Sequence, residues 1–280
     1  MKRTKILVLL MAMVLGMSGC GNDAAREEAQ QALKQEGMEL QSSGDYAGAI
    51  AKYEEALKLS DMEVGQEEID IAYYKASAQY RSGDLTGAID TYSAILAVKE
   101  EENSYLGRGL LYVAAKDAKN AEADLNKVLK ETDSPLIQGI IYNAVGDTQK
   151  AKESFEKAKK AGETDAIFYL ANIYEKVGDH NYAMILLEEY ISSGEAGAEG
   201  YLSVGKHYYD AGTYDKALVL ISQGIALGES GVLKSLMQEE IACYEKLGDF
   251  ETAREKAKSY LEKYPDDALI QKEYEFLKSR

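Results

Sequence analysis

Residues 171–187 have the sequence ANIYEKVGDHNYAMILL, and the order of residue types in this stretch recurs along the chain. A small residue comes first, followed by a tyrosine, a glycine with an acid behind it, an alanine and a large apolar residue. In this copy the five marked positions are Ala171, Tyr174, Gly178, Ala183 and Leu187. A repeated order of this kind has to be recognised before any single helix is assigned, because repeats determine the whole fold.

The glycine position can be followed through seven copies, with a lysine in place of glycine in the third. The seven residues are Gly44, Gly83, Lys116, Gly146, Gly178, Gly212 and Gly248. The first and the last are 204 residues apart, so the six intervals between them have a mean length of 34 residues.

The other positions keep constant offsets from this glycine. Alanine follows it by five residues in every copy, as Ala49, Ala88, Ala121, Ala151, Ala183, Ala217 and Ala253. Seven residues before it stand Gly37, Ala76, Gly109, Gly139, Ala171, Gly205 and, as the one large residue, Ile241. Four residues before it, the last five copies have Tyr112, Tyr142, Tyr174, Tyr208 and Tyr244. Nine residues after it stand Tyr53, Tyr92, Leu125, Phe155, Leu187, Ile221 and Ala257.

These offsets have a physical explanation in paired helices. Apolar residues spaced as in Tyr53, Ala56 and Leu57 indicate amphipathic helices. The glycine can adopt a positive φ where the first helix ends, and the acid after it can cap the start of the second. Small residues allow the two helices to approach closely. One pair cannot bury its apolar face alone, so neighbouring pairs must stack.

The pattern resembles the tetratricopeptide repeat, a helix–turn–helix unit of about 34 residues. The resemblance covers residues 30–265 and implies an all-α fold, a superhelical solenoid of about seven repeats. The expected repeats are 30–68, 69–101, 102–131, 132–163, 164–197, 198–233 and 234–265, followed by a C-terminal capping helix at 266–280. The tryptophan common early in the first helix of family members is absent here.

The first twenty residues predict a targeting signal. Lys2, Arg3 and Lys5 precede an apolar run and a group of small residues, which is typical of a secretory signal peptide. Residues 17–20, MSGC, resemble the lipobox of bacterial lipoproteins. This resemblance implies cleavage after residue 19, a diacylglycerol on Cys20, a short tether over 20–29, and a lipid-anchored protein on the extracytoplasmic face of a bacterial cell envelope. The alternatives are an ordinary secreted protein with a free Cys20 and a buried N-terminal helix.

The composition excludes several classes of function. With 48 Asp and Glu against 32 Lys and Arg, the net charge is −16, which opposes nucleic-acid binding. Removal of residues 1–19 would make it −19, so a lipid and not a basic patch would have to hold the protein on an anionic membrane. Two cysteines provide neither a disulfide framework nor a four-thiolate zinc site, and Cys243 is expected to be a buried apolar residue. No catalytic group and no metal site stands out, so we expect a protein that is not an enzyme and needs no cofactor besides the covalent lipid.

The resemblance also implies a site for a partner, since the first helix of each repeat lines a concave groove in this family. Carried over position by position, the groove consists of Tyr73, Tyr80, Leu106, Leu110, Val113, Leu136, Ile140, Asn143, Phe168, Asn172, Lys206 and Tyr209. Grooves of this kind hold an extended or helical segment of another protein. We therefore expect a scaffold that binds another envelope or secreted protein or peptide.

Two alternatives to this interpretation remain at the level of sequence. Tight superhelical winding or the chain's own N-terminus would cover the groove residues. An uptake-type lipoprotein would instead bind a glycan or another small ligand, with Tyr73, Tyr80 and Tyr209 stacking on sugar rings.

Overall fold

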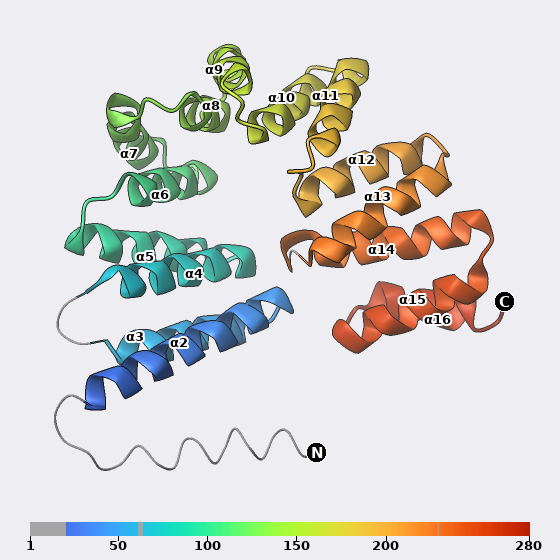
Figure 1. The fold of residues 1–280 in the computed structure, drawn as a ribbon, viewed down its shortest axis with the longest axis horizontal. Helices are drawn as coiled ribbons and strands as arrows, with labels where there is room; N and C mark the ends of the chain where they lie inside the picture. Colours follow the sequence, from blue (N-terminus) through green and yellow to red (C-terminus); the bar gives the residue numbers. More distant parts are fainter. Residues whose placement is uncertain (1–20, 61–63, 229) are drawn as a thin grey trace. The chain divides into compact units, whose positions relative to one another are not determined.

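The computed structural model describes residues 21–60, 64–228 and 230–280 of the 280-residue chain. Fifteen helices and no strand lie within these residues (Figure 1). They are α2 (Gly21–Ser42), α3 (Tyr46–Lys58), α4 (Gln66–Ser82), α5 (Leu85–Val98), α6 (Glu102–Ala114), α7 (Ala118–Glu131), α8 (Pro135–Ala144), α9 (Thr148–Lys160), α10 (Asp165–Lys176), α11 (His180–Ser192), α12 (Ala198–Asp210), α13 (Tyr214–Leu227), α14 (Ser230–Leu247), α15 (Phe250–Lys263) and α16 (Ala268–Leu277). The expected all-α fold of helix–turn–helix repeats is confirmed.

The chain forms two compact units, one ending at Ala115 and the other beginning at Lys116. In the first unit α2 packs on α3 and α4 on α5, and α6 follows α5. In the second unit the pairs are α8 with α9, α10 with α11, α12 with α13, and α14 with α15, and α16 packs on α15. We call the even-numbered helices α2 to α14 first helices and the odd-numbered helices α3 to α15 second helices.

The turns within the pairs have the conformation that the sequence predicts. At the end of α4, Gly83 has a φ of 88° and its backbone N–H donates to carbonyl oxygens of the last turn. Asp84 then accepts a hydrogen bond from the backbone N–H of Gly87 and caps α5. The same cap is formed by Asp45, Asp117, Asp147, Asp179 and Asp249. Thr213 is the exception, since its side chain does not cap α13.

In three of the pairs, a glycine of the first helix lies against the large residue nine positions after the turn. A Cβ atom added to Gly139 would stand 2.5 Å from the ring of Phe155, and one added to Gly37 would stand 2.5 Å from the ring of Tyr53. At Gly205 the nearest atom, in Ile221, would be 2.7 Å away. Because real Cβ atoms do not approach other atoms so closely, the missing side chain is what lets the ring or branched chain pack on the helix.

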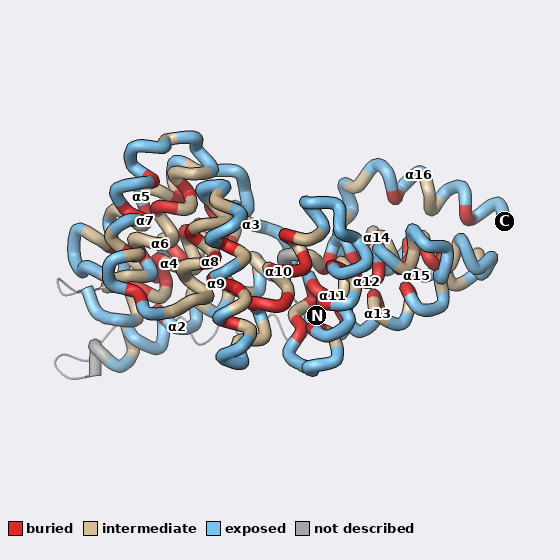
Figure 2. The backbone as a smooth tube through the Cα atoms, turned by 90° about the horizontal axis from the view of Figure 1, so that it is seen from above, coloured by how far each residue is buried: buried red, intermediate tan, exposed pale blue. Residues whose placement is uncertain are grey.

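The core of each unit lies between the paired helices, where the tube of Figure 2 is red. The alanine that recurs five residues after the turn position is buried in all seven copies. The recurring tyrosines are half-buried, and several lie under a cation. The ammonium of Lys152 is 4.4 Å from the ring centre of Tyr174, and that of Lys150 is 5.2 Å from the ring centre of Tyr142. Cation–π contacts of this kind give these tyrosines a structural role.

The structure differs from the sequence analysis at the start of the first helix. Residues 21–29 were expected to form a tether, but α2 begins at Gly21. A helix advances about 1.5 Å per residue, so this segment reaches about 14 Å, far less than an extended chain. The signal peptide, the lipobox and Cys20 lie outside the described residues. Among the helices that the structure describes, none is long and apolar enough to cross a bilayer.

Candidate functional site

The predicted groove residues all lie on first helices, and we call their set the first-helix surface. In the first unit, both the hydroxyl and the ring of Tyr73 contact neighbouring side chains. Its hydroxyl is hydrogen-bonded to the carboxylate of Glu101 at 3.0 Å and to the hydroxyl of Ser104 at 2.7 Å, and its ring meets the ring of Tyr92 edge-on at 5.8 Å. Burial raises the pKa of Tyr73 to about 12. Tyr73 therefore ties α4 to α5 and α6, and little of it is left for a ligand.

The other predicted residues of the first unit are more accessible. Tyr80 lies in the last turn of α4 with 56% of its surface exposed. Leu106, Leu110 and Val113 are half-buried on α6. Of the tyrosines that could stack on a sugar, Tyr80 is the one whose ring is open to solvent in this unit.

In the second unit, α8 and α10 contribute three apolar members of the first-helix surface. Leu136, Ile140 and Phe168 are half-buried and pack against one hydrophobic cluster centred on Phe155. The ring of Phe168 lies 5.5 Å from the ring of Tyr190. These side chains are thus part of the core as well as of the surface, which makes their replacement by a charged residue a poor test of binding.

Asn143 on α8 and Asn172 on α10 differ from their apolar neighbours. Both side chains are half-buried, yet neither amide hydrogen-bonds to another described residue. An amide group offers two donors and an acceptor, and a half-buried one without partners is costly unless water or a ligand satisfies it. These two amides are the members of the first-helix surface that are best placed to bind another backbone.

Toward the C-terminus the first-helix surface becomes charged. The ammonium of Lys206 on α12 forms an ion pair of 2.6 Å with Glu239 on α14. The ring of Tyr209 lies 5.3 Å from that of Tyr214, so it is engaged like Tyr73. Burial, reinforced by the carboxyl group of Glu273 on α16, raises the pKa of Glu245 on α14 to about 7.

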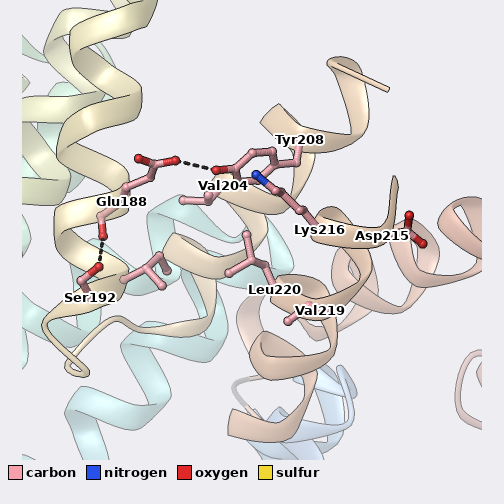
Figure 3. A pocket seen from close by; sticks show the side chains of 9 residues that line it. Glu188, Ser192, Val204, Tyr208, Asp215, Lys216, Val219 and Leu220 are labelled. Carbon is pink, nitrogen blue, oxygen red and sulfur yellow. Dashed lines mark hydrogen bonds between the residues drawn. The ribbon is translucent and has the colours of Figure 1, made fainter. Parts of the chain in front are cut away.

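A cleft that the sequence analysis did not predict lies between the second helices α11 and α13 (Figure 3). It has a volume of about 530 Å³. Its lining comprises Glu188, Ile191 and Ser192 of α11, Val204 and Tyr208 of α12, and Asp215, Lys216, Val219 and Leu220 of α13. Ile191, Val204, Val219 and Leu220 give it an aliphatic wall, and the other lining residues carry polar groups.

The rim of the α11–α13 cleft is an ordered polar cluster. The Tyr208 hydroxyl donates a hydrogen bond of 2.5 Å to the Glu188 carboxylate, as Figure 3 shows. This hydrogen bond to a carboxylate is the main reason that the pKa of Tyr208 is raised. The ammonium of Lys216 lies 5.1 Å from the ring centre of Tyr208. Tyr208 of α12 thus contacts both second helices that border the cleft, α11 and α13.

A second cleft of about 400 Å³ lies in the first unit between α3, α4 and α5. Its wall includes Leu57, Ile69, Ile95 and the exposed Val64 and Val98. The two clefts thus occupy equivalent places in the repeat, since each lies between the second helices of successive pairs.

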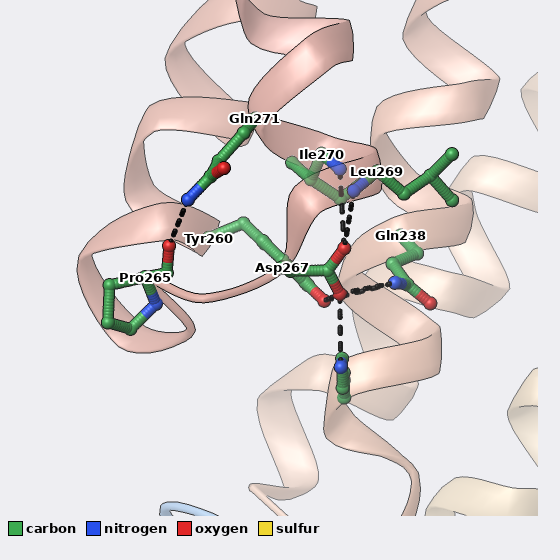
Figure 4. A network of polar contacts seen from close by, with 8 residues as sticks. Gln238, Tyr260, Pro265, Asp267, Leu269, Ile270 and Gln271 are labelled. Carbon is green, nitrogen blue, oxygen red and sulfur yellow. Dashed lines mark hydrogen bonds and ion pairs between the residues drawn. The ribbon is translucent and has the colours of Figure 1, made fainter.

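The C-terminal helix is attached through a polar network around Asp267 (Figure 4). One carboxylate oxygen of Asp267 accepts hydrogen bonds from the hydroxyl of Tyr260 at 2.6 Å and from the amide of Gln238 at 3.3 Å, and it lies 3.0 Å from the ammonium of Lys234. The other oxygen caps α16 through two backbone N–H groups. The Tyr260 hydrogen bond and Lys234 lower the pKa of Asp267 to about 2.

The groups with chemical reactivity lie in structural positions. Cys243 is fully buried, and burial raises the pKa of its thiol to about 12, so it is the buried apolar residue that we expected. His180 is hydrogen-bonded to Glu175 at 2.7 Å. Within the part of the chain that the structure describes, no three His, Cys, Asp or Glu side chains are grouped to hold a metal ion.

Comparison with known proteins identifies the repeats directly. The family models for tetratricopeptide repeats match residues 34–104 and 242–267. A search of curated protein sequences found no match.

Several solved structures have a similar fold. A tetratricopeptide repeat protein from Parabacteroides merdae has 17% identity and a TM-score of 0.48, covering 89% of this chain and 99% of that one. The Cut9-Hcn1 assembly of the APC/C has 11% identity and a TM-score of 0.51, covering 83% of this chain and 52% of that one. PilW, a type IV pilus biogenesis factor, has 17% identity and a TM-score of 0.50, covering 75% of this chain and 99% of that one. For the two structures with TM-scores of 0.51 and 0.50, the likeness at such identities shows the fold alone.

Proposed function

We infer that this chain is a membrane-anchored scaffold on the extracytoplasmic face of a bacterial envelope, where it binds a segment of another envelope or secreted protein. Tetratricopeptide repeats generally mediate protein–protein interactions as scaffolds, and such repeats are present at both ends of the described chain. PilW, of similar fold, is a type IV pilus biogenesis factor, and assembly of an envelope structure is a role of the same kind.

The observation that carries the binding site is the pair of amides on the first-helix surface. A bound segment can exchange hydrogen bonds with Asn143 and Asn172 through its own backbone, and this contact does not depend on the sequence of the segment. Its apolar side chains can rest on the exposed parts of Leu136, Ile140 and Phe168. Specificity then comes from the side chains and affinity partly from the backbone.

Site-specific cross-linking tests this surface. A photo-reactive residue is placed at Asn143 or Asn172 in the living cell, and, as a matched control, at Glu153, which is exposed on the second helix α9 of the same repeat as Asn143. We expect one envelope protein to be cross-linked from Asn143 and Asn172 and not from Glu153. The double variant Asn143→Ala, Asn172→Ala should bind that protein at least about tenfold more weakly, with an unchanged helical CD spectrum. Equal binding by the double variant contradicts the assignment.

The anchor is a separate part of the proposal and has its own test. Metabolic labelling with a fatty acid should label the wild-type chain, and Cys20→Ala should lose both the label and membrane association. A chain that stays labelled after Cys20→Ala contradicts anchoring at this residue. The two or three acyl chains that a lipoprotein cysteine carries suffice for stable anchoring, whereas one chain gives only marginal binding.

A further inference from the structure

The α11–α13 cleft differs from the rest of the outer surface in the residues that border it. Seven residues after the turn position, the second helices carry Ala51, Asp90, Ala123, Glu153 and Glu255 in five of the seven copies. In the other two copies, on α11 and α13, this position holds Ile185 and Val219, of which Val219 lines the cleft. Their side chains are 58% and 59% exposed. Exposed aliphatic residues at an outward position that is elsewhere alanine or acidic indicate a surface used for contact.

The two clefts lie beside the two longest connections between successive pairs. The connection from α11 to α12 has five residues, and that from α3 to α4 has seven. The other connections between successive pairs have four residues or fewer. The α11–α12 connection lies between the two pairs that border the α11–α13 cleft, and the α3–α4 connection lies between the two pairs that border the cleft of the first unit. In the α11–α13 cleft, Val204 and Tyr208 of α12 complete the lining between the two second helices.

The charge at the rim indicates what the cleft can hold. Two of its three charged lining residues, Glu188 and Asp215, are acids. The one cation, Lys216, lies against the ring of Tyr208. A partner with a cationic side chain is favoured by this local balance and by the overall charge of −16.

We propose that the α11–α13 cleft is a second docking surface, which binds a protein segment that presents aliphatic side chains beside a lysine or arginine. The aliphatic side chains enter between Ile191, Val204 and Val219, and the cation pairs with the carboxylate of Glu188, which Tyr208 holds at the rim. A groove between two outer helices suits an extended or helical segment. The cleft is lined by the second helices α11 and α13 and by Val204 and Tyr208 of α12, and none of its lining residues belongs to the first-helix surface, so one chain can hold two partners or two parts of one partner.

Selection from a displayed library of random peptides of about twelve residues tests the proposal. The bait is the full-length protein, and peptides that also bind its Val219→Asp variant are removed. We expect the recovered peptides to be rich in leucine, isoleucine or valine next to lysine or arginine. Their affinity, measured by fluorescence anisotropy, should fall at least about tenfold with Val219→Asp and with Glu188→Lys. Hydrogen exchange should slow in α11 to α13 when a peptide binds.

Two controls make the result specific. Ala123→Asp introduces the same charge at the equivalent position of another second helix, and it should leave peptide binding unchanged. The Asn143→Ala, Asn172→Ala variant should also bind the peptides normally, so failure here and failure of the first-helix surface are distinguishable. Because Val219 is 59% exposed, Val219→Asp should keep the wild-type CD spectrum and melting temperature.

Three outcomes would overturn the proposal. Recovery of no peptide that distinguishes wild type from Val219→Asp would show that the cleft binds no such segment. Enrichment of acidic peptides would show that the charge argument is wrong. Binding of a glycan that is lost with Val219→Asp, without any peptide binding, would assign the cleft to a different class of ligand.

Discussion

Lys116 is the residue at which the repeat departs from its own turn chemistry. Its φ is 60°, in the left-handed region, where the other turns have glycine. A side chain in this region costs about 1 kcal/mol relative to glycine. Lys116→Gly should therefore raise the free energy of unfolding by about 0.5–1 kcal/mol, part of the gain being offset by the greater entropy of the unfolded chain.

Urea unfolding followed by CD measures this change. The converse substitution, Gly83→Lys, is the matched control, since Gly83 has a φ of 88° and no neighbouring atom that a Cβ would meet. It should lower stability by a similar amount. A Lys116→Gly variant that is less stable than the wild type would contradict the claim that the positive φ of Lys116 strains this turn.

Gly139 tests the close approach of two helices at a single atom. A Cβ here would stand 2.5 Å from the ring of Phe155, which is fully buried. Overpacking of this kind costs about 1–3 kcal/mol, more than the helix propensity that alanine contributes. Gly139→Ala should thus lower the urea midpoint, and Gly139→Ala with Phe155→Leu should recover part of the loss. A stabilised Gly139→Ala variant would show that the ring moves aside freely.

At the scale of helices, the seventh pair reverses the sizes of the two partners. Ile241 stands where the other first helices have glycine or alanine, and Ala257 stands where the second helices have a large residue. Both are buried in one cluster with Tyr260 and Leu277. The space between the two helices is therefore filled by one large and one small side chain, as in the other pairs. Here the first helix supplies the large side chain.

A double-mutant cycle should expose this exchange. Ile241→Ala leaves a cavity and should cost about 2–4 kcal/mol, and Ala257→Ile overpacks the same space and should cost about 1–3 kcal/mol. The double variant should be more stable than the sum of the two losses implies, by about 1 kcal/mol or more in thermal unfolding. Additive losses would mean that the two positions do not share one space.

The C-terminal helix should respond to acid through Asp267. Its pKa is lowered to about 2 from an ordinary value near 3.8, so its contribution to stability is complete above pH 4 and is lost as the pH falls toward 2. After allowance for screening by solvent the loss is about 1 kcal/mol. The protection factors of α16 against hydrogen exchange, which are corrected for the intrinsic effect of pH on amide exchange, should fall over this range in the wild type.

The Asp267→Asn variant should show lower protection factors of α16 at neutral pH and little further change in protection in acid. The pKa of Glu245 on α14 is shifted in the opposite direction from that of Asp267. Its pKa is raised to about 7, so α16 loses stability as the pH rises from 4.5 through 7, and Glu245→Gln should remove this loss without affecting the acid limb. An acid response that is unchanged in Asp267→Asn would contradict the role of this carboxylate.

The sequence predicts the pairs because each repeated position has one local cause. Glycine turns, aspartate caps and small residues follow from rules that act within a single helix pair, and the structure confirms them, for example at Gly83 and Asp84. The state of Tyr73 does not follow from such rules, because its partners Glu101 and Ser104 belong to the next pair. The α11–α13 cleft does not follow from these rules either, because it lies between two pairs. It depends on how two pairs stack, although Val219, an aliphatic residue where five of the seven copies have alanine or an acid, is a signal in the sequence.

For the molecule as a whole, charge is the property that no single pair determines. Acidic residues outnumber basic ones by 48 to 32, and the excess is distributed over both units, so repulsion between like charges opposes the compact state. Most of the ion pairs found among the described residues have an exposed partner, as in Lys206 with Glu239, and each contributes little. Repulsion should therefore outweigh attraction at low ionic strength.

Stability should accordingly rise with salt. Between about 20 mM and about 300 mM NaCl, where the screening length shortens to a few ångströms, we expect the urea midpoint to increase. A variant in which two exposed acids of second helices are neutralised, Glu153→Gln and Glu255→Gln, should have a higher urea midpoint at low salt. Its midpoint should increase less with salt than that of the wild type. Sucrose at matched osmolality separates screening from preferential exclusion, because it should stabilise both proteins equally. A midpoint that falls with salt would mean that attraction in ion pairs, and not repulsion between acids, dominates the electrostatic contribution to stability.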